Sequence, residues 1–281
     1  PGGLLRSELH SGIEFDYGTH FIMETLDKEI DNLLFDFIDD NWTRLPYLKA
    51  GNFFNGKLNE HSPSMDLRTL DKNSYNKCIS ELFEDKKEIS VSNLDIQLVH
   101  SFGKTITKKV YEPILKKYYQ TDLDKLSLNS HSLASSRVIV LDSARTKELK
   151  KNERFDNLIS FHSFKERVSI ANSFYPKKSG IGLWLKTLYK KFELKGGKII
   201  NKAHIESLSF KSQSIHSIRL QNHQNLDCDK VVSTISPIFL LNAAKVDLPK
   251  NLSKPKSVNT VLLHMGFDKK FLTELYYLNC F

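Results

Sequence analysis

The chain has 281 residues, of which 40% are hydrophobic and 11% aromatic, so it can bury a substantial core and is not intrinsically disordered. Its formal net charge of +8 raises the question of a nucleic-acid or membrane-surface partner. The lysines, however, occur in short groups between apolar residues, which is typical of solvated helix faces, and no nucleic-acid-binding motif accompanies them. We therefore expect no nucleic-acid partner.

The three cysteines, Cys78, Cys228 and Cys280, are widely separated and form no C-x-x-C pair. This usage favours a reducing compartment, so we expect a cytoplasmic location and no metal site. No apolar run reaches the roughly 18 to 20 residues of a membrane helix, and the first residues do not resemble a signal peptide. Peripheral contact with a membrane stays open. Because the chain starts at Pro1 and not at Met, we expect a fragment or a processed product.

Adjacent glycines, Gly2 and Gly3, open the chain, and a short alternating run leads to Gly18. A backbone without Cβ atoms can lie directly against a ligand. A loose terminus followed by a plain hairpin is the alternative reading. Residues 27–38 have apolar side chains at helical spacing, which predicts a helix packed by its apolar face, with Asp31 and Asp36 outward.

The composition changes near residue 41, which indicates a crossover between domains. The pair Asn55-Gly56 predicts a type I′ turn between two short strands. Residues 96–126 are helical in pattern, with Pro113 expected to bend or restart the helix. Residues 143–168 are rich in charge and predict a solvated loop over a substrate cleft, in which His162 is a surface or packing residue.

Gly180 and Gly182 precede a predicted helix that ends at a glycine cap near Gly196. Amides at such a helix start can hold a phosphate, but the motif is too short for a Walker loop or a dinucleotide fingerprint. Beyond it we predict a strand, turn and strand over 197–208, further strands at 215–220 and 259–267, and a buried strand at 229–234.

Residues 2–7, Gly-Gly-Leu-Leu-Arg-Ser, and 15–20, Phe-Asp-Tyr-Gly-Thr-His, resemble the second flavin-contacting motif of the FAD-dependent amine-oxidase superfamily. This superfamily includes protoporphyrinogen oxidases, phytoene-desaturase-like enzymes and UDP-galactopyranose mutases. Residues 102–127 and 174–185 resemble later segments of its members in the same order.

The resemblance implies a mixed α/β fold, with an incomplete FAD/NAD(P)-binding Rossmann-like domain interleaved with an α+β substrate domain. The FAD-binding part would comprise residues 1–41 and 177–246, and the substrate-binding part residues 42–176 and 247–281. The superfamily's first Gly-x-Gly-x-x-Gly unit and its last flavin motif are not in this chain. We therefore expect the chain by itself to bind FAD weakly or not at all.

By the same resemblance, the double glycine runs along the pyrophosphate and ribityl chain, His20 lies beside the isoalloxazine, and the backbone at Ile205 contacts the adenine. Leu4 stands where many members have an arginine, so phosphate pairing would shift to Arg6. The full set of implied FAD contacts is Gly2, Gly3, Leu4, Arg6, Ser7, Gly18, Thr19, His20, Ile205, Ser233 and Thr234.

These features predict an FAD-dependent oxidoreductase that moves a hydride from a small organic molecule to the flavin. An anionic or lipid-linked substrate is among the options. Asn259 stands near the place where many amine oxidases have a lysine, which weakens the case for amine oxidation itself. Two alternatives remain open: a flavin-dependent nucleotide-sugar mutase and a non-catalytic remnant without flavin. The sequence assigns no catalytic residue and no oligomeric state.

Overall fold

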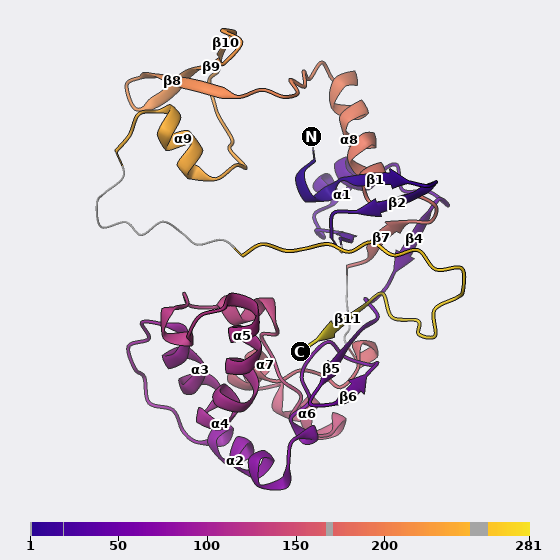
Figure 1. The fold of residues 1–281 in the computed structure, drawn as a ribbon, viewed down its shortest axis with the longest axis vertical. Helices are drawn as coiled ribbons and strands as arrows, with labels where there is room; N and C mark the ends of the chain where they lie inside the picture. The colour runs from indigo at the N-terminus through magenta and orange to yellow at the C-terminus, as the bar shows by residue number, and fades with distance from the viewer. Residues whose placement is uncertain (1, 19, 167–170, 248–257) are drawn as a thin grey trace. The chain divides into compact units, whose positions relative to one another are not determined.

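The structure is a computed structural model that describes residues 2–18, 20–166, 171–247 and 258–281 (Figure 1). Its contacts divide the chain into two compact units: a small unit of residues 1–3 and 184–259, and a large unit of residues 4–183 and 260–281. The FAD-binding and substrate-binding domains predicted from the sequence have other boundaries. That functional division stays a prediction.

The large unit begins with a hairpin of two antiparallel strands, β1 (Ser7–His10) and β2 (Ile13–Asp16). A three-stranded antiparallel sheet follows, in which β7 (Ser173–Pro176) lies between β3 (Ile22–Met23) and β4 (Trp42–Leu45). The central strand thus comes from a distant part of the chain and joins the N-terminal segment to the residues before Gly180.

Helix α1 (Lys28–Phe35) confirms the predicted helix near residues 27–38. Asp27 caps it, because the carboxylate accepts hydrogen bonds from the backbone N–H groups of Glu29 and Ile30. Phe35 packs against Phe174 of β7, with ring centroids 5.7 Å apart, whereas Ile30 and Leu33 are 46% and 51% exposed. The apolar face of α1 is therefore only partly packed.

A second sheet of the large unit has the order β11-β5-β6. Strands β5 (Ala50–Phe54) and β6 (Lys57–Asn59) form the predicted hairpin, and β11 (Tyr277–Cys280) pairs with β5 in parallel. Asn55 and Gly56 have φ values of 50° and 72°, as a type I′ turn requires, so the Asn-Gly prediction is confirmed.

The hydrophobic core of the large unit is helical. It is built from α2 (Lys72–Phe83), α3 (Leu94–Phe102), the short α4 (Lys104–Ile106) and α5 (Glu112–Tyr119). Leu82, Leu94, Leu98, Phe102 and Leu115 are among its fully buried side chains.

A π-helical turn, Thr107–Tyr111, connects α4 to α5. Pro113 follows in the first turn of α5, where its missing N–H costs least. In an uninterrupted α-helix the proline would leave the carbonyl of residue 109 without its donor, and the π-helical turn contains this residue. The sequence expectation that Pro113 restarts the helix is therefore confirmed.

The charged segment 143–166 is not the loop that the sequence predicts. It forms two short helices, α6 (Ser143–Leu149) and α7 (Glu153–Leu158), capped by the side chains of Asp142 and Asn152. Their charged faces are solvated, whereas Thr146 and Ile159 are fully buried. The prediction was wrong because it weighed the charges and overlooked the two capping residues. Residues 167–170 lie outside the described part.

The small unit contains most of α8 (Gly182–Leu194), the antiparallel strands β8 (Ile205–Lys211), β9 (Ser214–Leu220) and β10 (Asn225–Asp227), and α9 (Pro237–Ala243). Helix α9 contacts β8. The predicted helix before Gly196 and the predicted strand at 215–220 are confirmed.

Three strand predictions are wrong. Residues 198–200 are not a strand, so 197–208 supplies only the start of β8. Residues 229–234 and the described stretch 258–267 are also not strands. Val232 is 92% exposed and Val261 is 90% exposed, which contradicts a buried strand. An apolar run becomes a strand only where a neighbour completes its ladder, and no described residue pairs with either run.

Within the described ranges, no helix combines the length and the apolar character needed to cross a lipid bilayer.

Gly103 ends α3 with φ of 91°, and a Cβ placed there would lie 2.5 Å from the Cβ of Glu81. Glu81 in turn accepts hydrogen bonds from the N–H and the hydroxyl of Thr105. We expect Gly103→Ala to lower the free energy of unfolding by more than about 2 kcal/mol, as read from urea denaturation. Gly56→Ala is the matched control: its φ is also positive, but nothing lies within 4 Å, so about 1 kcal/mol is expected. If both variants lost the same free energy of unfolding, the result would contradict a steric contact between residue 103 and Glu81.

The three thiols are expected to differ in reactivity. Cys78 is fully buried in the helical core, and burial raises its pKa to about 11, whereas Cys280 is exposed and Cys228 is partly exposed. In the native protein at slightly alkaline pH, a chromogenic thiol reagent should modify Cys228 and Cys280 quickly and Cys78 only after unfolding. Rapid modification of all three would show that the core opens easily.

Candidate functional site

The start of helix α8 is held by side chains of the N-terminal hairpin. Strand alternation puts Glu14 and Asp16 on one face of β2, and Ser7 lies directly opposite Asp16 on β1. The backbone N–H groups of Gly180, Ile181 and Gly182 donate to Glu14 at 2.7 Å, Asp16 at 2.9 Å and Ser7 at 2.8 Å. We call these three side chains the α8 cap.

The backbone amides just before helix α8 donate their hydrogen bonds to the α8 cap. A helix start exposes unpaired N–H groups and favours negative charge, so the carboxylates of Glu14 and Asp16 suit it. The amides of Gly180 and Gly182, which the sequence offers as a phosphate site, are therefore already occupied by the protein's own side chains.

Asp16 also fixes a tyrosine. The Tyr175 hydroxyl on β7 donates to the second carboxylate oxygen of Asp16 at 2.5 Å, and Ser7 donates to the first at 2.6 Å. Burial, followed by the hydrogen bond to Asp16, raises the pKa of Tyr175 well above its ordinary value. Tyr175 therefore stays protonated and has a defined ring orientation.

An open cleft of about 660 Å³ lies beside this network, entirely within the large unit. We call it the aromatic cleft. Ring pairs surround it: Phe21 lies 5.7 Å from Tyr175 and 5.8 Å from Tyr276, and Phe15 lies 4.9 Å from His264, measured between centroids. It is lined by residues from β2 and the segment after it, by Tyr175 and by C-terminal residues: Glu14, Phe15, Asp16, Gly18, His20, Phe21, Tyr175, Leu262, Leu263, His264, Met265, Phe271 and Tyr276.

Gly18 and His20, two of the residues that the sequence assigns to the flavin, line this cleft. The Nε2 atom of His20 is buried and has no hydrogen-bond partner among the described residues. Gly18 has φ of 122°, and a Cβ on it would lie 3.1 Å from that Nε2. A buried ring nitrogen without a partner normally costs stability, so a ligand group that bonds to it would remove that cost.

The residues of the cleft fit a planar aromatic cofactor. The rings provide flat apolar walls, and Gly18, which has no Cβ, leaves room for the imidazole of His20, whose Nε2 has no partner among the described residues. Among the described residues, no cluster of His, Cys, Asp or Glu suits a metal ion.

The remaining predicted residues of the N-terminal motif have other contacts. Leu4 lies in a 3-10 turn, Gly3–Leu5, and is 65% exposed. The Arg6 guanidinium lies over the ring of Tyr17, 4.4 Å from its centroid. The Ser7 hydroxyl is committed to Asp16 and to Gly182. Thr19 lies outside the described residues. The phosphate and ribityl roles of these residues stay predictions.

The other predicted contacts belong to the small unit: Gly2, Gly3, Ile205, Ser233 and Thr234. Ile205 is the first residue of β8 and is partly buried. Ser233 and Thr234 are exposed and lie outside any strand. Their convergence with Gly18 and His20 on one cofactor stays a prediction.

The sequence analysis missed the residues that organise the site. Glu14, Asp16 and Tyr175 were treated as parts of motifs and not as partners of one another. The alternation of Glu14 and Asp16 was a readable signal that both side chains share a face. Their partners at 175–182 are far away in sequence, and no local pattern marks them.

No protein-family profile matches the chain, and no curated protein matches it. Among solved structures, the chain is similar to a protein described as "Crystal structure of reduced UDP-Galactopyranose mutase". The TM-score is 0.60 at 18% sequence identity, over 87% of this chain and 50% of that one. The similarity confirms the predicted fold class, mixed α/β of Rossmann-like type. The chain spans about half the length of the structure that it matches.

A double-mutant cycle tests the link between Asp16 and Tyr175. Asp16→Asn should lower the free energy of unfolding by about 1 to 3 kcal/mol, because the amide cannot accept all three hydrogen bonds. Tyr175→Phe should cost about 1 kcal/mol, and the double variant should cost less than the sum. Tyr17→Phe is the control, since that hydroxyl donates to Glu8 and should show no coupling with Asp16→Asn. Additive losses for the pair Asp16 and Tyr175 would contradict the bond.

Proposed function

We propose that this chain is part of an FAD-dependent enzyme and that the aromatic cleft contacts the flavin ring. The observation that carries the proposal is the buried, unpartnered Nε2 of His20 beside Gly18 in an aromatic wall. The turn that holds these residues resembles the isoalloxazine-contacting turn of the amine-oxidase superfamily. The fold similarity to a UDP-galactopyranose mutase, from one of the enzyme groups that this superfamily includes, supports the same reading.

The reaction that we favour is oxidation of a small organic substrate, in which the flavin, when bound, accepts a hydride from a C–H or C–N bond. His20 would donate or accept one hydrogen bond at the ring. Phe21, Tyr175 and Tyr276 would orient the reactants and exclude water. Tyr175 would act as a fixed wall and not as an acid, because the hydrogen bond to Asp16 holds its proton.

A flavin-dependent nucleotide-sugar mutase is the second candidate, and the fold similarity to a UDP-galactopyranose mutase favours it. The net charge of +8 suits the diphosphate of such a substrate. A non-catalytic protein that keeps the fold without flavin is the third candidate. The substrate, the electron acceptor, the remaining FAD contacts and the cytoplasmic location stay predictions.

The visible spectrum of the protein tests flavin binding. The product of the complete reading frame that contains this chain should be purified and should show the absorption of an oxidised flavin. His20→Ala should weaken flavin binding about tenfold, since it removes the partner of a buried polar contact. His10→Ala is the matched control, because His10 is exposed on β1 and does not line the cleft. A folded, colourless protein that takes up no added FAD would contradict both enzyme readings.

The same preparation separates the two reactions. Under anaerobic conditions, an amine or polyene substrate should bleach the flavin if the protein is an oxidoreductase. If it is a mutase, UDP-galactopyranose should be isomerised only after the flavin is reduced, with no net consumption of reductant.

A further inference from the structure

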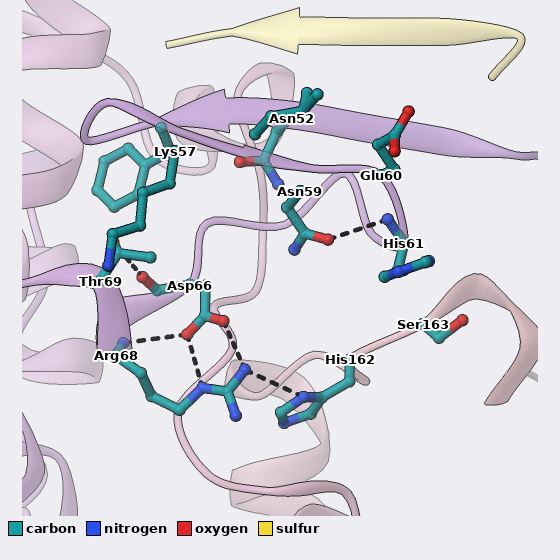
Figure 2. Close-up of a pocket in the computed structure, with 12 residues that line it drawn as sticks. Asn52, Lys57, Asn59, Glu60, His61, Asp66, Arg68, Thr69, His162 and Ser163 are labelled. Carbon is teal, nitrogen blue, oxygen red and sulfur yellow. Dashed lines mark hydrogen bonds and ion pairs between the residues drawn. The ribbon is translucent and has the colours of Figure 1, made fainter. Parts of the chain in front are cut away.

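Ser163 lines two pockets of the large unit, and neither shares a lining residue with the aromatic cleft. One of them, of about 450 Å³, has a polar wall that mixes Arg68 with the carboxylates of Glu60 and Asp66 (Figure 2). In this wall, His162 Nδ1 lies 3.1 Å from Arg68 Nη2, which agrees with the packing role expected for His162 from the sequence. Because groups of both signs line it, the wall does not select a ligand by charge.

The other pocket, of about 180 Å³, receives side chains from both three-stranded sheets of the large unit, and we call it the apolar pocket. Met23 of β3 is paired with Ser173 of β7, and Ala50 of β5 is paired with Tyr277 of β11. Paired residues of a ladder point to the same face of their sheet, so each sheet turns two neighbouring side chains toward the pocket. Residues 46–48, which connect β4 to β5, line it as well.

The wall of the apolar pocket is largely aromatic. Tyr47 stacks on Phe164, with ring centroids 5.2 Å apart, and Phe161 is a further ring of the lining. None of the described residues that line the pocket is charged. Lys150 lies over the ring of Phe161, but it is paired with Asp156 at 2.5 Å and does not line the pocket. A charged ligand would lose its hydration here without gaining a counter-ion, so the wall selects an uncharged ligand.

Of the three serines in the lining, Ser173 has a hydroxyl that makes no hydrogen bond to another described residue. The Ser62 hydroxyl accepts from the backbone N–H of Ser64 at 3.2 Å, and the Ser163 hydroxyl accepts from that of Lys165 at 3.2 Å. Ser173 is 6% exposed, so bulk solvent has little access to it. A buried hydroxyl without a partner lowers stability, and a ligand that bonds to this hydroxyl would remove that cost.

The volume of the pocket limits the size of the ligand. An apolar cavity of about 150 Å³ is enough for benzene, so about 180 Å³ accommodates one ring with a small substituent. The aromatic side chains of the wall favour edge-to-face or offset packing with such a ring. We propose that the apolar pocket binds an uncharged molecule with one aromatic ring and one hydroxyl group, a phenol, whose hydroxyl bonds to Ser173. The proposal does not rest on flavin binding, because the aromatic cleft is a separate site.

Methyl NMR of the complete protein, labelled at its methionines and titrated with phenol, tests the site. The chain has three methionines. Met23 lines the apolar pocket, Met265 lines the aromatic cleft, and Met65 is fully buried in the helical core. Phenol should shift the Met23 signal saturably, because a bound ring displaces the resonance of a neighbouring methyl group. The loss of that signal in Met23→Leu assigns it.

The Ser173 hydroxyl is tested by comparing phenol with benzene. Ser173→Ala should raise the dissociation constant of phenol about fivefold, because it removes one hydrogen bond, and should leave that of benzene unchanged. Thr43→Ala is the matched control, since this hydroxyl residue belongs to β4 of the same sheet but does not line the pocket. Benzoate, which has the same ring and a negative charge, should bind at least tenfold more weakly than phenol.

Four results would overturn the proposal: phenol leaves the Met23 signal unchanged, phenol shifts only the Met265 signal, Ser173→Ala binds phenol as tightly as the parent protein, or benzoate binds as tightly as phenol. An equal loss of affinity for benzene and phenol in Ser173→Ala would contradict the hydrogen bond to Ser173.

Discussion

The carboxylate of Asp16 is the interaction on which the N-terminal part of the large unit depends. One oxygen accepts from Ser7 and from the amide of Ile181, and the other accepts from Tyr175. The carboxylate thereby joins the β1-β2 hairpin, strand β7 and the start of α8 in a single network. Every member of this partly buried network has a partner, so the network favours one arrangement of these segments.

This constraint also shapes the chemistry of the site. The amides before α8 donate to the side chains of the α8 cap, so they are not available to bind an anion. The adjacent cleft is left with aromatic walls and one unpartnered histidine nitrogen.

The features predicted correctly from the sequence are those that local interactions determine. The Asn55-Gly56 turn, the helix that follows Asp27 and the restart at Pro113 each depend on residues within one or two turns, and the structure confirms them. The predictions that failed concern segments whose structure depends on partners far away in the sequence. Residues 229–234 contain three β-branched residues, which favour a strand, but have no ladder partner among the described residues. The placement of Gly18 and His20 on one cleft followed from motif resemblance, whereas Tyr175 and the segment 262–276 could not be assigned to it from sequence periodicity.

The hydrogen bonds of the α8 cap join residues that are 165 to 175 positions apart in the chain. During synthesis, the first hairpin leaves the ribosome long before its partners at 180–182 exist. The helices between residues 94 and 119 contact one another and so depend more on neighbours close in sequence. The α8 cap and the wall of the aromatic cleft, which includes Tyr175 and residues between 262 and 276, therefore close only after most of the chain has been synthesised.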